Sequence, residues 1–196
     1  MATRWLYLAR HGETDWNAAG RWQGHTDIPL NARGREQARL VAETMSQTVL
    51  AGVVSSDLSR ARETAQIIAD RLGIDLVYLD AALRERAFGP FEGLTRDQCV
   101  RLHPREWQAW RDEQVAPEGA ESRSVLAARV ALGLGRAAQE VARDDAAALV
   151  VTHGGALRAV LAEATGTLPP PIANGAVWRV AWDSRIVSAE ALATGG

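Results

Sequence analysis

Two short, uninterrupted apolar runs, at residues 5–9 and 146–151, are the clearest pattern along the chain. Bounded apolar runs of this length are typical of central strands in a parallel sheet. The first run is followed directly by Arg10–Gly12 and the second by Thr152–Gly154, so a histidine and then a glycine follow each. Because ligands bind at the carboxyl ends of the strands in open α/β sheets, both histidines are expected at one ligand-binding edge.

The rest of the chain alternates between helix-like and strand-like segments. Helices are predicted from Asn31 to Leu50, from an N-cap at Asp57 to a stop at Gly73, from Ser122 or Ser124 to Val141, and from Gly154 to near Gly166. Strands are predicted over residues 52–56, 75–79, 177–182 and 186–192, the last two paired antiparallel. This alternation predicts the α/β class, with a three-layer α/β/α sandwich and a mostly parallel central sheet.

Residues 80–121 have a less regular pattern, with aromatic side chains among glycine, proline and charged residues. We expect one domain over residues 1–196, in which this segment is an inserted cover over the active site, because such insertions commonly shape substrate pockets. A pair of amphipathic helices that closes the hydrophobic core fits the pattern equally well. The aromatic side chains for which pocket and core both remain open are Trp16, Trp22, Phe88, Phe91, Trp107 and Trp110.

The composition is that of an ordinary soluble globular protein, with 47% apolar and 23% charged residues. A net charge of −2 gives no reason to expect nucleic acid or an anionic membrane as a partner. No apolar stretch approaches the ~20 residues of a membrane span, and no secretory signal is visible, so a cytoplasmic location is expected. A monomer or homodimer is the expected quaternary state. The single Cys99 excludes an internal disulfide, and its helix-like surroundings predict a structural thiol.

All 22 basic residues are arginine. The absence of lysine excludes a Walker A phosphate loop, Schiff-base chemistry and Ser-Lys catalysis. Any phosphate group is therefore expected to bind guanidinium groups, whose planar forks match its oxygens. The candidates are Arg10, beside the first histidine, and Arg60, shortly after the strand at 52–56, together with the backbone N–H groups at Gly154.

His11 is a candidate nucleophile, because a neutral imidazole can attack phosphorus and hold the phosphoryl group covalently. It must stay unprotonated near pH 7, and neighbouring arginine charges would lower its pKa in that direction. Phosphoryl transfer spreads negative charge over the phosphoryl oxygens, so it requires positioned donors and cations. Arg10, Arg60 and His153 can supply them.

A leaving alkoxide needs a proton, and Glu85 is the candidate general acid. It stands in a loop-like segment after the third predicted strand. Spacing alone favours a different interpretation, in which Glu85 forms a surface ion pair with Arg84 or Arg86.

Five segments together resemble the histidine phosphatase superfamily, also called the phosphoglycerate mutase-like family. They are Leu8–Asn17, Gln23–Leu30, Ser55–Ala65, Leu83–Gly93 and Thr152–Gly155. The first is highly specific for the family, and the matches extend over essentially the whole chain. The resemblance implies a phosphoglycerate mutase-like fold and a metal-independent phosphatase without a cofactor, which acts on small-molecule phosphate esters.

The resemblance also implies roles for individual residues. His11 would be the phosphorylated nucleophile and Glu85 the proton donor. The residues that would bind the phosphoryl group are Arg10, Arg60 and His153, assisted by Asn17 and the backbone of Gly24. The segment Pro117–Ser122 departs from the family pattern at Ala120, which puts the turn geometry there in question.

Three other functions are alternatives to this phosphatase. A metal hydrolase is disfavoured because His25 and His103 match no metal-ligand spacing. A non-catalytic phosphate-binding protein has no use for Glu85 as a general acid. A cofactor-dependent mutase of the same family would carry a longer, more basic insertion before the second histidine. Only 68 positions separate Glu85 from His153, so hydrolysis rather than isomerisation is expected.

Overall fold

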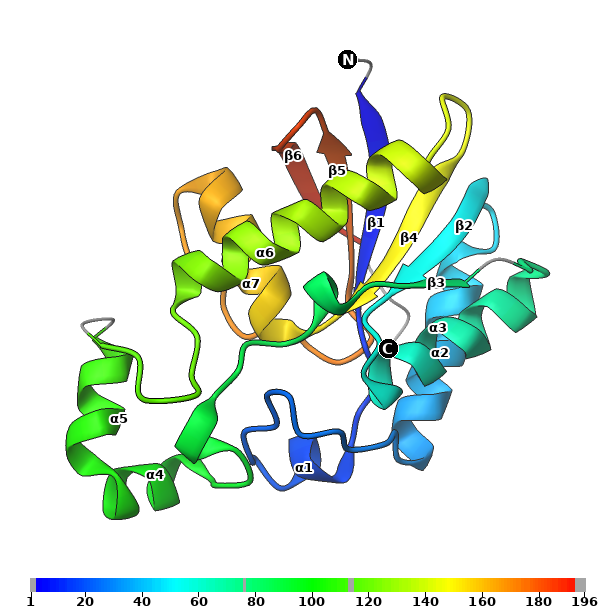
Figure 1. Ribbon diagram of the computed structural model, residues 1–196. Helices are drawn as coiled ribbons and strands as arrows, with labels where there is room; N and C mark the ends of the chain where they lie inside the picture. Colours follow the sequence, from blue (N-terminus) through cyan, green and yellow to red (C-terminus); the bar gives the residue numbers. More distant parts are fainter. Residues whose placement is uncertain (1–2, 76, 113–114, 193–196) are drawn as a thin grey trace.

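A six-stranded sheet forms the middle layer of the computed structural model, which describes residues 3–75, 77–112 and 115–192 (Figure 1). Its strands are β1 (Arg4–Arg10), β2 (Leu50–Ser55), β3 (Val77–Leu79), β4 (Ala147–Thr152), β5 (Val177–Trp182) and β6 (Ile186–Ala191), in the spatial order β3-β2-β4-β1-β5-β6. The strands β1 to β4 pair in parallel, whereas β5 pairs antiparallel with both β1 and β6. The predicted mostly parallel sheet and its antiparallel final pair are confirmed.

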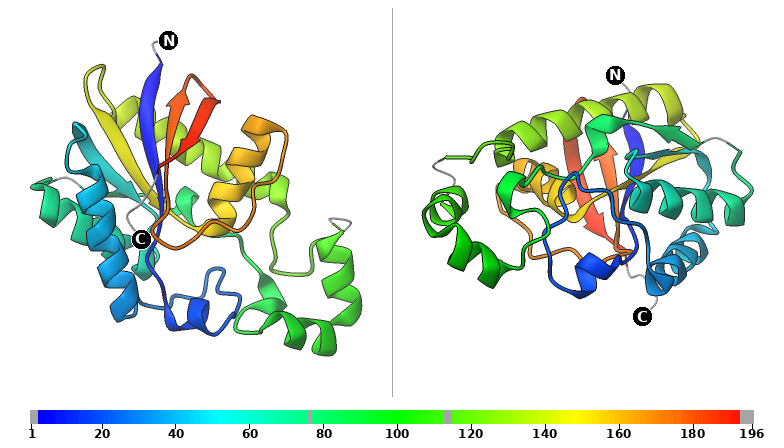
Figure 2. Two further views of the ribbon diagram at one scale, coloured as in Figure 1. Left: turned by 180° about the vertical axis from the view of Figure 1, so that it is seen from behind. Right: turned by 60° about the horizontal axis from the view of Figure 1, so that its bottom comes forward.

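Helices cover both faces of this sheet. The α-helices are α1 (Asp15–Ala18), α2 (Ala32–Met45), α3 (Ser59–Leu72), α4 (Arg96–Leu102), α5 (Pro104–Arg111), α6 (Arg123–Arg136) and α7 (Gly154–Thr165), and the short turns are η1 (Ala81–Leu83), η2 (Gly89–Phe91) and the π-helical η3 (Ala137–Val141). One face carries α6 and α7 and the other α2 and α3, as the front and back views show (Figure 1, Figure 2). The predicted α/β/α sandwich is confirmed. None of the described helices is long and apolar enough to cross a membrane.

Side chains that alternate along the strands produce two apolar layers. In β1, Leu8 belongs to the cluster under α6 and α7, and Ala9 to the cluster under α2 and α3. In β4, Val150 and Val151 divide in the same way. A strand that is apolar on both faces reads as a continuous apolar run, which is why the two runs in the sequence identified central strands.

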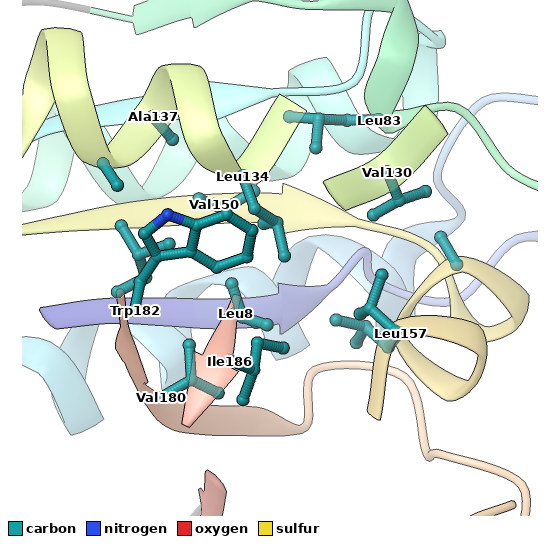
Figure 3. Close-up of a cluster of buried hydrophobic side chains, with 14 of the residues drawn as sticks. Leu8, Leu83, Val130, Leu134, Ala137, Val150, Leu157, Val180, Trp182 and Ile186 are labelled. Carbon is teal, nitrogen blue, oxygen red and sulfur yellow. The ribbon is translucent and has the colours of Figure 1, made fainter. Parts of the chain in front are cut away.

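The larger apolar cluster fixes α6 and α7 on the sheet (Figure 3). Leu134 of α6 and Leu157 of α7 are completely buried in it, together with Leu8 and Val150 of the sheet. Burial of one leucine side chain contributes about 1.5–3 kcal/mol. Since α7 starts directly after β4, this packing also fixes the first turn of α7 relative to the strand ends.

The sheet register places the two histidines side by side. In the parallel pair of β1 and β4, Arg10 lies opposite Thr152. The next residues, His11 and His153, therefore leave the sheet at the same edge. The predicted meeting of the two strand ends is confirmed.

One predicted helix is too long. The helix expected from Asn31 to Leu50 ends at Met45, with Asn31 as its N-cap, and Leu50 already belongs to β2. No glycine or proline marks this end in the sequence. The β-branched Thr48 and Val49 favour extended backbone, and pairing of β2 with β4 satisfies the backbone that follows.

The predicted N-cap Asp57 does not cap a helix. Its carboxylate accepts two hydrogen bonds from Arg84, at 2.7 and 2.6 Å, and α3 begins only at Ser59. Asp27, from a distant loop, accepts hydrogen bonds from both the backbone N–H and the hydroxyl of Ser59. Gly73, in contrast, ends α3 in the left-handed conformation, as predicted.

The remaining boundaries lie close to the predicted ones. Ser122 is the N-cap of α6, and the helical backbone continues through η3 to Val141. Gly166 ends α7 in the left-handed conformation. The strand predicted over 75–79 is observed as β3, while position 76 within it lies outside the described residues.

The irregular segment 80–121 contains the two helices α4 and α5, which close an aromatic cluster. The buried members are Phe88, Phe91, Cys99, Trp107 and Trp110. Trp22 packs against this cluster from the loop after α1, with its ring centroid 4.8 Å from that of Phe88. Within this segment α4 and α5 thus pack on an aromatic cluster separate from the two apolar layers of the sheet. Burial raises the pKa of the Cys99 thiol, in agreement with a structural role.

Candidate active site

A cavity of about 300 Å³ opens at the carboxyl ends of β1 and β4. Six predicted site residues line it, namely Arg10, His11, Asn17, Arg60, Glu85 and Gly154. A larger cavity of about 680 Å³ lies between α6, α7 and β6. Its lining is mostly alanine, valine and isoleucine and includes no histidine, so the chemistry belongs to the smaller cavity.

The ring of His11 is buried, and a backbone acceptor fixes its protonation. Its Nδ1 lies 2.6 Å from the carbonyl oxygen of Gly12. Because a carbonyl oxygen can only accept, Nδ1 carries the proton and Nε2 keeps a free lone pair. The Gly12 N–H donates in turn to Thr64 Oγ1 at 3.1 Å, which holds this backbone in place. His11 is therefore held in the tautomer that can attack phosphorus through Nε2.

His153 lies beside His11, with ring centroids 5.0 Å apart. Its Nε2 is 2.8 Å from the Ser56 hydroxyl, whose oxygen also accepts a hydrogen bond from the Leu58 N–H. The Ser56 hydroxyl donates its own proton to Nε2 of His153. Nε2 is therefore the unprotonated ring nitrogen, and Nδ1 carries the ring proton. This Nδ1 is buried and has no hydrogen-bond partner among the described residues, which leaves a donor for a bound anion.

Both histidines are held in the neutral form. Burial lowers the pKa of His11 well below its ordinary value, and the charges of Arg10 and Arg60 lower it further. Burial and the charge of Arg60 likewise lower the pKa of His153. The predicted effect of the arginines is confirmed, and burial is the larger cause for both rings.

Two guanidinium groups flank the histidines. Arg60, in the first turn of α3, is fully buried and donates to the carbonyl oxygens of Thr26 and Gly24 at 3.0 and 2.8 Å. Arg10, at the end of β1, donates to the carbonyl oxygen of Ile172 at 2.5 Å. The Nε atoms of both arginines are buried without a hydrogen-bond partner in the described part of the chain. Since an unpaired buried donor costs about 1–3 kcal/mol, these two atoms point to an anionic ligand.

The carboxylate of Glu85 lies at the N-terminus of α7. It accepts hydrogen bonds from the backbone N–H groups of Gly155 at 2.9 Å, Ala156 at 3.1 Å and Arg86 at 2.8 Å. The partial positive charge of a helix N-terminus favours a carboxylate at this position. A Cβ at position 155 would lie 2.3 Å from Glu85 Oε1, so this close approach requires the glycine.

The interpretation of Glu85 as a surface ion pair is wrong. Arg84 pairs with Asp57, and the Arg86 guanidinium lies 4.3 Å from the ring centroid of Trp110. Glu85 instead lines the cavity that holds His11.

Long-range contacts brace the backbone around Glu85. Arg129 of α6 donates to three carbonyl oxygens of the segment 82–85 and forms an ion pair with Glu121 at 2.7 Å. His25 lies with its Nε2 2.9 Å from the Glu85 carbonyl oxygen, to which it donates. Neither role could be predicted from the sequence, because both contacts join segments that meet only in the folded chain.

The departure from the family pattern at Ala120 leaves the adjoining turn intact. Gly119 supplies the left-handed φ of +76°, and Ala120 itself has no positive φ. Ala120 pairs with Phe88 in an antiparallel bridge, and the Glu121 N–H donates to the Ala87 carbonyl oxygen at 2.9 Å. The turn thus still ties the segment 117–122 to the loop of Glu85.

The two assisting residues differ in their positions. Asn17 lines the cavity, and its Oδ1 accepts hydrogen bonds from Thr14 and Asn174, which leaves the amide NH₂ to donate to a ligand. Gly24 is outside the lining. Its left-handed backbone, with φ of +56°, instead presents its carbonyl oxygen to Arg60 and so positions that guanidinium group.

Trp22 and Phe88, for which the sequence leaves pocket and core both open, line the cavity. Further residues that were not predicted for the site also line it, namely Gly20, Arg21, Gln23, Gly155, Arg158, Pro171 and Ile172. The signal for Arg158 was helical spacing, since it stands one turn after Gly154 on the same face of α7. Phe88 and Trp22 show that part of the aromatic cluster also forms a pocket wall.

The donor groups of the site suit an anion. Guanidinium, amide and backbone N–H groups dominate the lining, and the one carboxylate there already accepts three hydrogen bonds. Within the described ranges, no three His, Cys, Asp or Glu side chains gather as metal ligands would.

The sequence and fold are similar to those of a phosphatase and of proteins named as probable phosphoglycerate mutases or mutase-like. The family model of the histidine phosphatase superfamily, branch 1, matches residues 6–188. Phosphoglycerate mutase-like protein 4 of Arabidopsis thaliana is 40% identical over 159 residues, which cover 79% of this chain and 68% of that protein. A probable phosphoglycerate mutase of Serratia proteamaculans is 40% identical over 168 residues, 82% of this chain and 74% of that protein. The structure of mycobacterial glucosyl-3-phosphoglycerate phosphatase with VO3 is 33% identical, with a TM-score of 0.79 over 96% of this chain and 97% of that one.

Proposed function

The chain belongs to branch 1 of the histidine phosphatase superfamily, and from this we propose that it is a phosphomonoester hydrolase that works through a phosphohistidine at His11. One observation carries the proposal. The neutral ring of His11, with Nε2 free, lines a cavity beside the buried and unpaired Nε donors of Arg10 and Arg60. An ester phosphate supplies acceptors for these donors and a phosphorus atom for the lone pair.

The reaction proceeds in two steps. In the first, Nε2 of His11 bonds to phosphorus while the bond from phosphorus to the ester oxygen breaks. Arg10, Arg60 and the Nδ1–H of His153 stabilise the charge on the phosphoryl oxygens. Glu85, which enters this step protonated, gives its proton to the leaving oxygen, so an alcohol departs and Glu85 remains as the carboxylate that the N–H groups of Gly155, Ala156 and Arg86 stabilise. In the second step water attacks phosphorus, Glu85 takes up a water proton, and His11 and inorganic phosphate are released.

The proposed reaction needs no metal ion. The guanidinium groups of Arg10 and Arg60 supply the positive charge that a metal ion supplies in other phosphoryl-transfer enzymes. The VO3 bound by the similar mycobacterial phosphatase is a phosphate-like oxyanion, which supports a site of this kind.

Trapping the intermediate tests the proposal. After brief incubation with a ³²P-labelled phosphate ester and an alkaline quench, the protein should carry an acid-labile phosphohistidine. His11→Ala should lose both the label and turnover, whereas His103→Gln, at a histidine outside the cavity lining, should keep them. Label that persists in His11→Ala, or activity that EDTA abolishes, would contradict this mechanism.

A second candidate function is a phosphoglycerate mutase, which the names of the two similar proteins favour. It shares the first step and differs in the fate of phosphohistidine, which passes to a second hydroxyl group rather than to water. A third candidate, a protein that only binds phosphate, leaves unexplained why Glu85 is braced inside the cavity.

A further inference from the structure

Two guanidinium groups besides those of Arg10 and Arg60 line the cavity, and they differ in their freedom. Arg21 donates from a terminal nitrogen to the carbonyl oxygen of Gly93 at 2.6 Å, so the protein itself holds it. Arg158 donates through Nε to the carbonyl oxygen of Pro169 at 2.8 Å. Its two terminal nitrogens have no hydrogen-bond partner among the described residues, so its fork is left for a ligand.

The cavity lining carries more positive charge than one phosphate group requires. It contains four guanidinium groups against the single carboxylate of Glu85, and His11 is neutral. Carboxylates beside the inner arginines, such as Glu13 near Arg10, are outside the lining. A phosphomonoester brings at most two negative charges, so positive charge remains, and the free fork of Arg158 is where it is accessible.

The surroundings of Arg158 do not balance its charge. In the described part of the chain no carboxylate lies within ion-pair distance of it. Burial and the nearby charge of Arg123 lower the pKa of Arg158, and the charge of Glu85 opposes this only in part. A partly buried cation without an ion-pair partner is stabilised by an anionic ligand.

We propose that Arg158 is a specificity residue that binds a second anionic group of the substrate, a carboxylate or a second phosphate, so that the preferred substrates are small phosphomonoesters with two anionic groups. This inference rests on the proposed phosphatase function. The cavity of about 300 Å³ is at the small end of ligand sites, so the second group must lie within a few bonds of the ester oxygen. Trp22 and Phe88 provide an apolar wall for the carbon skeleton between the two groups.

A purely structural role for Arg158 makes a different prediction. Its bond to Pro169 ties α7 to the loop whose Ile172 carbonyl holds Arg10. Loss of that tie would disturb the phosphate site itself. All esters would then be affected to the same degree, and inhibition by inorganic phosphate would weaken as well.

Matched ester pairs separate the two roles. We would measure kcat/KM for 3-phosphoglycerate against glycerol 3-phosphate, which lacks the carboxylate. The second pair is 1,3-propanediol bisphosphate against 3-hydroxypropyl phosphate, which lacks the second phosphate. Arg158→Gln retains a side-chain amide that can donate to Pro169, Arg158→Lys retains the charge, and Arg123→Gln removes a nearby charge outside the lining.

The wild type should prefer the ester with two anionic groups in at least one pair, and the preferred pair identifies the second group. Arg158→Gln should lower kcat/KM for that ester by about 10-fold to 100-fold, mainly through KM, as expected for loss of charge-assisted hydrogen bonds. The singly anionic ester and the inhibition constant of inorganic phosphate should change less than about threefold. Arg158→Lys should retain part of the preference, and Arg123→Gln nearly all of it.

Equal losses on both members of a pair, or a wild type without any preference, would overturn the role of Arg158 and leave the phosphatase function standing. Failure of the wild type to hydrolyse every ester, p-nitrophenyl phosphate included, would instead overturn the proposed function together with this inference.

Discussion

Glu85 Oε1 occupies the space that a Cβ at position 155 would need, at 2.3 Å from it. Gly155→Ala should therefore displace the carboxylate from the start of α7 and lower kcat for alkyl phosphates roughly tenfold, part of the 10²–10⁴ that a general acid contributes. Unfolding in urea should show a loss of only about 1 kcal/mol, because the group that must move is the end of a flexible side chain and the N–H groups at the start of α7 can bind water in its place. Gly135→Ala in α6, where the new Cβ meets Trp182 at an ordinary 3.6 Å, is the matched control and should keep full activity.

A second prediction at a single residue tests whether Glu85 acts as the general acid. Glu85→Gln keeps the shape of the side chain but cannot protonate a leaving oxygen. It should slow alkyl phosphates by roughly 100-fold or more, and p-nitrophenyl phosphate far less, since p-nitrophenolate leaves without a proton. Steady-state kinetics on both esters decide the matter, and equal losses would assign Glu85 a structural role.

Site residues could be predicted from the sequence where they lie at the end of a predicted strand. Arg10 directly follows the first apolar run, and His11 and His153 each come one residue further along, so their place at the strand ends could be predicted. Glu85 was identified only through the family resemblance, since spacing favoured an ion pair. Helical spacing from Gly154 places Arg158 on the same face of α7, but its access to the cavity also depends on where the loop before β5 lies, which no local pattern predicts.

Among the elements, α6 supports the loop of the general acid through one side chain. Arg129→Met removes hydrogen bonds to three carbonyl oxygens of the segment 82–85 and leaves Glu121 without its partner. We expect a loss of about 2–3 kcal/mol in the free energy of unfolding, together with lower activity on alkyl phosphates.

On the same helix, Arg136→Met breaks a pair with Asp80 in which the arginine is 45% exposed, against 22% for Arg129. That control should lose less than about 1 kcal/mol in urea unfolding and stay active. Equal destabilisation in the two variants would contradict the bracing role.

The ends of elements show which interactions a local pattern can reveal. The left-handed glycines that end α3 and α7 were predicted, because a glycine acts within its own turn. The start of α3 was not, because Asp27, more than thirty positions earlier, accepts the hydrogen bonds of Ser59. The end of α2 was missed for a similar reason, since Leu50 pairs with Ala147 of β4. Local patterns thus predicted which elements form, and tertiary contacts decided where some of them begin and end.

At the scale of the whole molecule, two neutral buried histidines make stability depend on pH. Folding lowers the pKa of His11 and His153, whereas the unfolded chain titrates near the ordinary value of about 6.5. Below that pH the unfolded chain binds protons that the folded chain excludes, so the free energy of unfolding decreases as pH falls. The slope reaches up to about 1.4 kcal/mol per pH unit for each ring, until the pH reaches the lowered pKa.

Urea unfolding at pH 7.5 and 5.5 should show this loss, and His153→Gln should reduce it. The lowered carboxyl pKa values of Asp57 and Glu121 act at lower pH, outside this window. A wild type equally stable at both pH values would contradict the neutral, buried state of the rings.

The fate of the phosphoryl group depends on how the whole chain encloses the cavity. A mutase must keep water from phosphohistidine while its intermediate turns over. Here 68 positions separate Glu85 from His153, and within that stretch Phe88 lines the cavity while no residue of α4 or α5 does. Those helices pack on the aromatic cluster instead and do not line the cavity, so we expect water to reach the phosphohistidine. Incubation with 3-phosphoglycerate and catalytic 2,3-bisphosphoglycerate should therefore yield inorganic phosphate. Phosphate release and isomer composition can be followed together, by colorimetry and by ³¹P NMR. Efficient formation of 2-phosphoglycerate without phosphate release would favour the mutase, and would mean that substrate closes the cavity more completely than the lining residues of the free protein do.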